Sequence, residues 1–516
     1  MPVAVTYPGV YVEEIPSSVH TITGAATSIA AFVGWAPQGP TGQAQLVLSW
    51  ADYSRQFGGL VPGVYLGYAV YQFFTNGGQQ AYIVRLVDKD AATATITLED
   101  SKSNAVLTVS ALNPGSWASN YAIAITSPPN ASTGFGLQVV NWPLPASPLP
   151  PVVVESFQNL WISSSSPRFV QAIVNNQSNY ITVEVGAGAT TVPAAGTTPF
   201  PASGAGSGNN GTVLQPVSTT GGKTGDFETQ LTGTNGYTLL QYVNFDLLCV
   251  PGEADPGTLS QLEGFCAQYR AMLIADCPSD ASVNSLSTGA ASVQDSAVAG
   301  LANAAYYFPW VNAPDPAQSN QPNTFPPSGF AAGLYAQTDA ARGVWKAPAG
   351  TQVSLTGVLG PSVVLNDAQN GVLNPLAINC IRNFTGYGTV LWGARTLQGS
   401  DIAGSQWKYV PVRRMALFLE SSLLAGLKWA VFEPNDNPLW SSIRLNVTSF
   451  MQTLFLQGAF QGQTPQEAYF VKCDGETTTQ ADINLGIVNI IVGFAPLQPA
   501  EFVVIQIQQM AGQLGA

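Results

Sequence analysis

Apolar residues in the last third of the chain follow the spacing of two helices. They recur every third or fourth position between residues 411 and 424, and again between residues 438 and 458. This is the pattern of a helix with one buried face. Gly426 is expected to end the first helix in a left-handed conformation. Asn437, which is followed by a proline, is expected to cap the second helix.

Short apolar runs between and after these helices predict strands. They occupy residues 429–432, 468–472 and 487–494, and turn-forming residues bound them. Helices and strands together predict a small α+β domain within residues 374–509, with the helices on one side of a sheet.

The last apolar run predicts a strand for which the chain offers no partner of its own. In residues 501–508, Val503, Ile505 and Ile507 alternate with other positions, which is the period of a half-buried strand. Only eight residues follow, and a bare apolar edge promotes aggregation unless something covers it. We therefore expect a neighbouring copy of the same chain to pair with this strand. The residues expected to exchange at this end are Phe502, Val503, Val504, Ile505, Gln506 and Ile507.

A second isolated strand is predicted near the N-terminus, in residues 8–16. Prolines bracket it, which separates it from helices and from central sheet positions. Residues 17–27 are polar and are expected to form a flexible tether, so the segment is interpreted as an extended arm. An ordinary first edge strand of its own domain is the alternative. The residues expected to pair with a neighbour are Val10, Tyr11, Val12 and Glu13.

The pattern of apolar and polar residues in the middle of the chain predicts a core domain that is interrupted by an insertion. Apolar strands alternate with helical stretches before residue 88 and after residue 236, and the unit at residues 245–275 is expected to be a parallel βαβ unit. Ser328 is expected to start a helix of small residues, followed by an extended stretch at residues 344–348. Core strands are expected at residues 28–34, 80–87, 245–250, 271–275 and 304–311.

Residues 88–236 have the alternating Thr, Ser, Val and Ile pattern of a β-rich domain. Residues 191–224 are rich in Gly, Ser, Pro and Thr and are expected to be a loop too polar to pack. Strands are expected at residues 94–98, 105–109, 121–126, 137–140, 152–157 and 180–185.

The predicted fold class is therefore a multidomain α+β protein. It has an α/β core, a small α+β C-terminal domain, an inserted all-β domain and extended terminal strand arms. The expected boundaries are 1–27 for the N-terminal linker arm, 28–87 plus 237–365 for the core, 88–236 for the insertion, 366–498 for the C-terminal domain and 499–516 for the donated strand arm.

Composition indicates a chain that hides much of its surface against partners. Hydrophobic residues make up 46% of the 516 residues, but charged residues only 9%, against about 25% in an average soluble protein. A charge-poor secreted β protein is the alternative explanation. The net charge is −13 with no basic run, which argues against direct binding of nucleic acid. No apolar run reaches the length of a membrane span, and the N-terminus does not resemble a signal peptide.

Candidate catalytic residues are few. His20 is the only histidine, which argues against a catalytic triad in a cleft and excludes a metal site built on several histidines. Glu253 and Asp255 follow a strand end, and Asp436 lies near a tryptophan, but turn and helix-cap roles explain all three better. We expect no enzyme activity and no cofactor. The five scattered cysteines are expected to be reduced thiols, inert where buried: Cys249, Cys266, Cys277, Cys380 and Cys473.

Several phrases, in this order and at this spacing, resemble those of contractile tail sheath proteins. The specific ones lie at residues 7–14 (YPGVYVEE), 32–40 (FVGWAPQGP), 73–85 (FFTNGGQQAYIVR), 326–350 (PPSGFAAGLYAQTDAARGVWKAPAG), 374–379 (NPLAIN), 386–388 (GYG), 392–397 (WGARTL), 432–440 (FEPNDNPLW), 462–474 (GQTPQEAYFVKCD) and 499–502 (PAEF). The longest of these, at residues 326–350, is the strongest match.

The resemblance implies a structural subunit of a contractile sheath, in a phage tail or a phage-like injection particle assembled in the cytoplasm. It implies stacked hexameric rings around an inner tube protein, with baseplate and terminator or cap proteins as further partners. No direct binding of nucleic acid and no membrane insertion are expected. A secreted β-rich hydrolase or adhesin is the alternative. Candidate cations for contacts with the tube or with other subunits are Arg413, Arg414, Lys428 and Arg444, of which the first three are expected to form a basic face.

Overall fold

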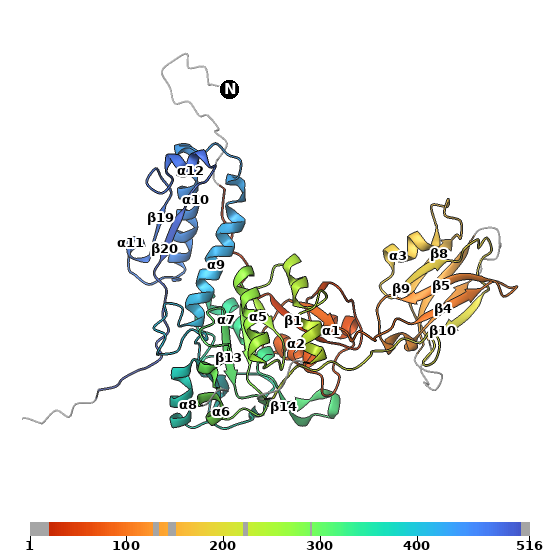
Figure 1. Cartoon of the computed structure of the whole chain (residues 1–516), viewed down its shortest axis with the longest axis horizontal. Helices are drawn as coiled ribbons and strands as arrows, with labels where there is room; N and C mark the ends of the chain where they lie inside the picture. Colours follow the sequence, from red (N-terminus) through yellow and green to blue (C-terminus); the bar gives the residue numbers. More distant parts are fainter. Residues whose placement is uncertain (1–19, 127–133, 143–150, 220–224, 289–291, 507–516) are drawn as a thin grey trace, which may run out of the picture. The chain divides into compact units, whose positions relative to one another are not determined.

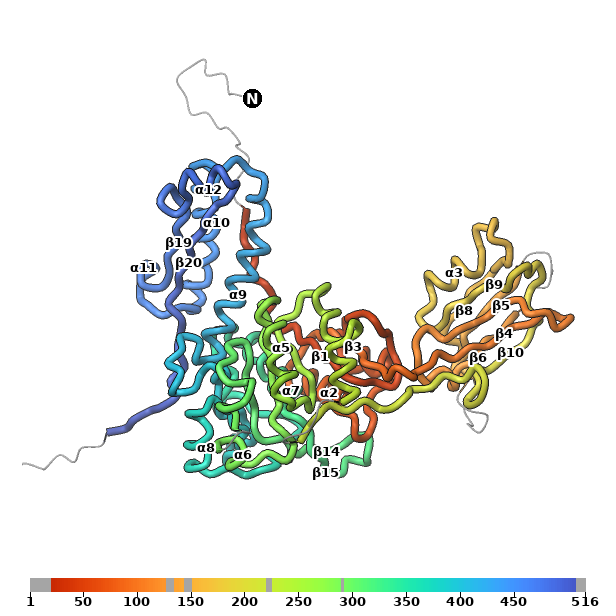
Figure 2. The backbone as a smooth tube through the Cα atoms, viewed as in Figure 1, coloured from red at the N-terminus to blue at the C-terminus, as the bar shows by residue number. Residues whose placement is uncertain are grey.

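The computed structural model describes residues 20–126, 134–142, 151–219, 225–288 and 292–506. The chain divides into two compact units (Figures 1 and 2). Residues 28–337 and 349–405 form the first, here called the sheet unit. Residues 1–27, 338–348 and 406–516 form the second, here called the terminal unit.

The sheet unit is built on eight strands, of which the inner six run parallel. Their order across the sheet is β18 (Gly388–Leu391), β17 (Ile378–Phe384), β13 (Ala304–Phe308), β12 (Met272–Asp276), β11 (Leu247–Cys249), β1 (Ala30–Trp35), β3 (Ala81–Leu86) and β2 (Ala44–Val47). The two outer strands, β18 and β2, pair antiparallel with their neighbours. β11 and β12 pair in parallel through α5 (Pro256–Tyr269), which confirms the predicted βαβ unit.

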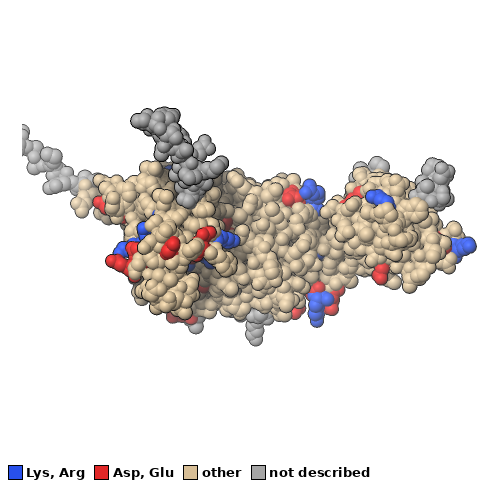
Figure 3. Space-filling model, turned by 90° about the horizontal axis from the view of Figure 1, so that it is seen from above, with Lys and Arg blue, Asp and Glu red and all other residues tan. Residues whose placement is uncertain are grey.

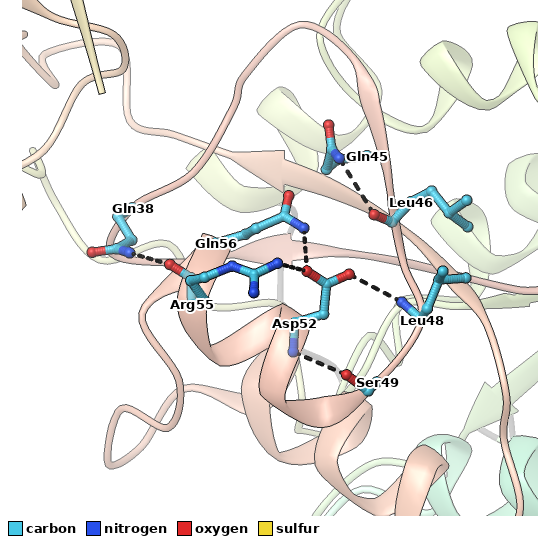
Figure 4. Close-up of polar contacts among 8 residues, drawn as sticks. All are labelled: Gln38, Gln45, Leu46, Leu48, Ser49, Asp52, Arg55 and Gln56. Atoms are coloured by element: carbon cyan, nitrogen blue, oxygen red, sulfur yellow. Dashed lines mark hydrogen bonds and ion pairs between the residues drawn. The ribbon is translucent and has the colours of Figure 1, made fainter. Parts of the chain in front are cut away.

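Helices accompany this sheet. They include α1 (Trp50–Phe57), α2 (Tyr65–Thr75), α4 (Asp226–Leu231), α6 (Val283–Ser287) and α8 (Asp367–Leu373). A side-chain cap starts three of these five, α1, α6 and α8. In α1, Ser49 Oγ accepts the amide of Asp52, whose carboxylate in turn pairs with Arg55 (Figure 4). A Cβ at Gly329 would lie 2.5 Å from the carbonyl oxygen of Ala69, so small residues let α7 (Ser328–Arg342) approach α2 closely. The stretch after α7 makes turns, so the extended chain predicted at residues 344–348 is wrong.

The inserted part of the sheet unit has its own core between two antiparallel sheets. One sheet is β4 (Thr95–Glu99), β5 (Ala105–Ala111) and β9 (Ile181–Val185), and the other is β10 (Gly196–Pro199), β6 (Tyr121–Thr126), β7 (Phe135–Asn141) and β8 (Val152–Leu160). α3 (Val170–Gln177) joins the same core. All six predicted strands are present. The prediction of an unpacked loop at residues 191–224 is wrong, because this stretch contains β10, and because its isolated apolar residues Phe200 and Leu214 are buried.

A small third sheet completes the sheet unit. It consists of β14 (Val311–Asp315), β15 (Gln321–Phe325) and β16 (Gly360–Pro361). Asp315 is buried here, and its carboxylate accepts a hydrogen bond of 2.6 Å from the Tyr68 hydroxyl of α2. This bond ties the small sheet to the helix that covers the large one.

The terminal unit is a helical layer against a two-stranded sheet. It contains α9 (Val410–Gly426), α10 (Asn437–Leu456), α11 (Pro465–Ala468) and α12 (Gln480–Asn484), together with β19 (Tyr469–Lys472) and β20 (Ile491–Phe494). The apolar faces of α9 and α10 meet in its core, which also takes in Ile22 and Val344. The two periodic helices and the last two strands are therefore where the sequence predicted them.

Local details of the terminal unit correct three predictions. The strand predicted at residues 429–432 is wrong, because the chain forms a 3₁₀ turn at Lys428–Ala430 and then exposes Phe432 fully, with φ at 71°. Gly426 is not left-handed but is the last helical residue of α9. Asp436, not Asn437, caps α10, because its carboxylate accepts the amide of Leu439. Among the described residues, no helix is both long and apolar enough to cross a membrane.

Candidate assembly site

The segment after β20 leaves the terminal unit without joining a strand. Residues 501–506 form no ladder with any described strand. Phe502, Val503, Val504 and Ile505 are 73–82% exposed. The Tyr409 hydroxyl, at the start of α9, donates a hydrogen bond of 3.2 Å to the carboxylate of Glu501. Gln506 is exposed as well, and Ile507, the last residue predicted to exchange here, lies outside the described residues.

The sheet in the same unit is incomplete on both sides. β19 and β20 pair antiparallel from Tyr469 opposite Phe494 to Lys472 opposite Ile491. Within the described part of the chain neither strand pairs with a second strand. An isolated bridge joins Phe460 to Pro496 just after β20, and the edges of the strands themselves remain open. α10 packs against β19, and so one face of the sheet is covered. Two-stranded sheets are marginal by themselves, and an open edge is a template for another strand.

The N-terminal residues predicted to exchange, Val10, Tyr11, Val12 and Glu13, lie outside the described residues. The chain is described from His20 onward, and this part is not the flexible tether that the sequence predicts at residues 17–27. Residues 20–27 run alongside α9 (Figure 2), and Ile22 is only 6% exposed. Polar composition hid this contact, because backbone groups and a single isoleucine make most of it.

The four candidate cations do not gather on one surface. Arg414 is buried, and its guanidinium binds Asp339 through two contacts of 2.6 and 2.9 Å, so the predicted basic face is wrong for this residue. Arg413 lies 4.8 Å from the ring centre of Trp407 and 3.6 Å from Glu420. Arg444 donates to the carbonyl of Cys473 and to Ser441 Oγ. Lys428 is exposed. Charged side chains are also sparse on the face seen in Figure 3.

The carboxylates considered for catalysis have structural roles. Asp255 accepts the amide of Thr258 at 2.7 Å and caps α5, as predicted. Glu253 is fully buried, and its Oε2 has no hydrogen-bond partner among the described residues. Burial raises the pKa of Glu253 to about 9, and the backbone amides of Asp255 and Ala254, which donate to its carboxylate, oppose this only partly. The side chain is therefore protonated at neutral pH and is held in the core as a neutral group.

Asp276 is a buried carboxylate that sequence reasoning missed. It lies at the end of β12, where it accepts hydrogen bonds from the amide of Gly252 and from both the amide and the hydroxyl of Ser328, at 2.7 to 2.8 Å. Burial raises its pKa to about 7 despite these three donors. Asp276 thus joins the loop before α5 to the start of α7. The sequence signal that could have identified this site is a single aspartate directly after the apolar run of β12.

The cysteines and the single histidine are the remaining side chains considered for chemistry. All five cysteines are free and buried, and burial raises the pKa of Cys249 and Cys277 well above the usual range. No cluster of three or more His, Cys, Asp or Glu side chains suited to a metal occurs in the described ranges. His20 stacks on Trp429 with ring centres 4.1 Å apart.

A hollow of about 660 Å³ lies between the inserted part and the rest of the sheet unit. Neutral amides line much of it, and two of them are already engaged: Gln38 donates to the carbonyl of Arg55, and Gln56 to the carboxylate of Asp52 (Figure 4). On the inserted side, Glu155 is held by Ser178 and Asn179. These polar groups are therefore satisfied within each part, and none of the four bonds crosses from one part to the other.

Comparison with known proteins identifies the family. A model of the phage tail sheath protein central domain matches residues 234–397, and one of the phage tail sheath C-terminal domain matches residues 403–510. The two regions together cover more than half of the chain. The chain belongs to the phage tail sheath family.

Relatives and solved structures agree with this assignment. A prophage major tail sheath protein of Pseudomonas aeruginosa is 31% identical over 49% of this chain and 62% of its own length, so the match spans less than two thirds of that relative. The tail sheath protein of Enterobacteria phage T4 is 29% identical over 33% of this chain and 24% of its own.

The fold is that of solved sheath proteins. The helical sheath of the anti-feeding prophage in its contracted state is 26% identical, with a TM-score of 0.57 over 98% of this chain and 100% of that one. A sheath tail protein of Listeria innocua has a TM-score of 0.61 at 12% identity over 93% and 97% of the two chains, which shows the fold alone. The matched relatives favour a sheath protein over the alternative of a secreted hydrolase or adhesin.

Proposed function

We propose that this chain is the structural subunit of a contractile sheath in a phage tail or a phage-like injection particle. The observation that carries the proposal is that one unit contains two incomplete elements, an unpaired apolar segment at residues 502–505 and an open two-stranded sheet. Family membership supports it, as does the likeness to a helical sheath in its contracted state.

The linkage between subunits is strand exchange. The exposed segment is apolar on both faces, because Phe502 and Val504 alternate with Val503 and Ile505. Such a run suits a strand covered on both sides rather than an edge facing water. Each backbone hydrogen bond contributes about 0.5–1.5 kcal/mol, and each buried large apolar side chain about 1.5–3 kcal/mol. A donated strand of five residues therefore forms a firm joint with the sheet of a neighbour.

The wider assembly follows from the same joint. The N-terminal residues Val10 to Glu13 pair with a second neighbour, so that subunits knit into stacked hexameric rings around an inner tube. Baseplate and terminator or cap proteins close the ends, and assembly takes place in the cytoplasm. Contraction moves the units as rigid bodies while the joints persist, and it draws on the metastable assembled state rather than on catalysis in this chain.

A single substitution in the exposed segment tests the proposal. Val504→Pro removes a backbone donor and disfavours pairing, whereas Val504→Thr keeps strand propensity and serves as the control. Because Val504 is 82% exposed, we expect both variants to unfold at the temperature of the wild type. Sedimentation and negative-stain microscopy should show tubes for wild type and Val504→Thr, but none for Val504→Pro.

Truncations test both ends of the linkage. Deletion of residues 1–15, or of residues 500–516, should leave a folded subunit that does not assemble. Tubes of wild-type length from either truncation, or from Val504→Pro, would contradict strand exchange.

A further inference from the structure

Residues His20–Thr27 form a strap along α9 that the sequence did not reveal. At one end the ring of His20 stacks on Trp429, and its amide donates to Asn446 Oδ1 at 3.1 Å. At the other end the carbonyl of Thr27 accepts a hydrogen bond of 2.6 Å from Arg414. The strap is thus fixed at both ends within the terminal unit.

The middle of the strap fits closely against the helix. The amide of Ala25 donates to Ser422 Oγ at 2.9 Å. A Cβ added at Gly426 would lie 2.7 Å from the Ile22 side chain, so that only glycine admits this isoleucine. A Cβ at Gly24 would lie 3.0 Å from the ring of Phe418. Hydrogen bonds and close packing therefore alternate along the strap.

The order of these contacts shows that the strap runs antiparallel to α9. Moving from His20 to Thr27, its partners move from Trp429 back to Arg414. The seven intervals from His20 to Thr27 span about 23 Å when the chain is extended, and the fifteen positions from Arg414 to Trp429, most of them in α9, rise by about the same distance. The whole strap therefore lies extended beside the helix. A pull along the helix axis would load all the contacts together, in shear, rather than one after another.

The described strap begins, and the C-terminal segment passes, at opposite ends of α9. The strap begins beside Trp429, just after the helix ends, while the C-terminal segment passes Tyr409, just before the helix begins. Figure 1 shows the same arrangement, with the C-terminal segment leaving near the start of α9. Seventeen helical residues separate the two points, which corresponds to about 25 Å.

We propose that His20–Thr27 is a mechanical anchor that transfers tension on the N-terminal arm to α9, and that α9 is the strut that spaces the two outgoing segments of one chain. The inference rests on the proposed function only in taking the arm to be pulled by a second copy of this chain. Gly426 and Ser422 are its positioning residues. Arg414 and Asp339 hold the inner end of the strap.

Force measurement on single chains tests the anchor without requiring assembly. One handle is attached at the N-terminus and the other at a cysteine introduced at Leu456, which is 76% exposed, whereas all native cysteines are buried. For the wild-type protein we expect a rupture step that releases the strap before the unit unfolds. Gly426→Ala, which adds a methyl group against Ile22, should lower this rupture force at least twofold.

Gly264→Ala is the matched control. Gly264 lies within α5, and a Cβ there meets nothing within 4 Å, so this variant changes helix propensity without touching the strap. It should leave the rupture force unchanged. Ser422→Ala, which removes the acceptor of Ala25 without adding volume, should lower the force as well. It replaces Gly426→Ala if that variant does not fold.

Hydrogen exchange gives a second readout. The amides of His20 and Ala25 should exchange at least tenfold faster in Gly426→Ala and Ser422→Ala, with unchanged exchange in the middle of α10. An unchanged rupture force in both strap variants, or a wild-type strap that ruptures only with the whole unit, would overturn the anchor. Failure of the wild-type protein to form tubes would instead contradict the proposed function and leave the anchor standing.

Discussion

Arg414 and Asp339 place two opposite charges in the interior of the terminal unit. Their side chains are only 3% and 4% exposed, and the carbonyl of Thr27 takes a further guanidinium hydrogen bond. Removal of one partner from a buried ion pair costs about 3–5 kcal/mol, because the other charge remains buried without compensation. This pair therefore determines whether three separate segments stay together.

Arg414→Met should lower the free energy of unfolding by about 3–5 kcal/mol, measured by urea denaturation of the full chain. The double variant Arg414→Met, Asp339→Met should recover most of this loss, since it leaves no unpaired charge. Lys428→Met, at an exposed lysine, should change stability by less than about 0.5 kcal/mol. A single variant as stable as the wild type would show that the pair does not hold these segments.

Glu253 makes stability depend on pH. Its pKa is raised by burial to about 9 in the folded protein, from an ordinary value of 4.5. The folded state therefore keeps a proton that the unfolded chain loses above pH 4.5, so stability is greatest at low pH and falls as pH rises toward 9. One such group changes the free energy of unfolding by up to about 1.4 kcal/mol per pH unit.

Glu253→Gln should remove this dependence, because a glutamine is neutral in both states. Asp276, whose pKa burial raises to about 7, contributes a slope of the same sign that fades between pH 7 and 8. Urea denaturation between pH 7 and 8 should therefore show declining stability in the wild type and a clearly shallower decline in Glu253→Gln. Glu433→Gln, at an exposed position, should keep the wild-type slope. Equal slopes in all three proteins would mean that Glu253 is ionised in the fold.

At the scale of elements, the sequence predicted the helices and strands that have a buried apolar face. It did not predict the turns and the strap that depend on local contacts. The faces of α9 and α10 show their period directly, and β12 was recognisable as a short apolar run that is buried throughout. Residues 429–432 are as apolar as a strand, yet they form a turn in which Val431 and Phe432 are exposed rather than buried. The strap at residues 20–27 could not be predicted, since its contacts come from backbone groups, one histidine ring and one isoleucine, which form no periodic pattern. The unpaired C-terminal segment was foreseen from its apolar residues; its exchange with a neighbour stays a prediction.

The two-stranded sheet should change its hydrogen exchange on assembly. In the isolated subunit, the amides of β19 and β20 that point away from their shared ladder have no strand to bond within the described part of the chain. They should exchange rapidly in monomers and be protected in tubes. Mass spectrometry of the peptides spanning residues 469–472 and 491–494 measures both states. Protection that is equal in monomers and tubes would contradict strand addition to this sheet.

At the scale of the whole molecule, the boundary between the two hydrophobic cores of the sheet unit does not coincide with the boundary that composition predicts. The inserted core draws its buried residues from positions 94–200, whereas Leu214, Phe227 and Leu231 pack in the core of the eight-stranded sheet. Composition could not show this, because residues 201–236 share the polar texture of the insertion. Three buried apolar side chains, rather than average polarity, decide to which core the stretch belongs.

The insertion should therefore be removable at the point where its two ends meet. Ala92 and Asn209 bond to each other in both directions, with N···O distances of 3.1 and 3.0 Å, so an Asn-Gly pair in place of residues 93–208 would close a tight hairpin. The remaining chain loses one hydrogen bond of the buried Arg85, to the carbonyl of Pro114, but keeps those to Ala36 and Gly39. The expected cost is about 1–3 kcal/mol.

A larger excision is the control that makes this deletion informative. If residues 88–236 are replaced by the same pair, Leu214, Phe227 and Leu231 leave the large core, and cavities of this kind cost about 2–5 kcal/mol for each side chain. Thermal unfolding followed by circular dichroism should therefore show one cooperative transition for the shorter excision and none for the longer one. Because the exchange segments lie outside both cuts, the shorter variant should also still form tubes. If it unfolds while the longer excision remains folded, the two cores are not independent, and the insertion is part of the framework that supports the sheet.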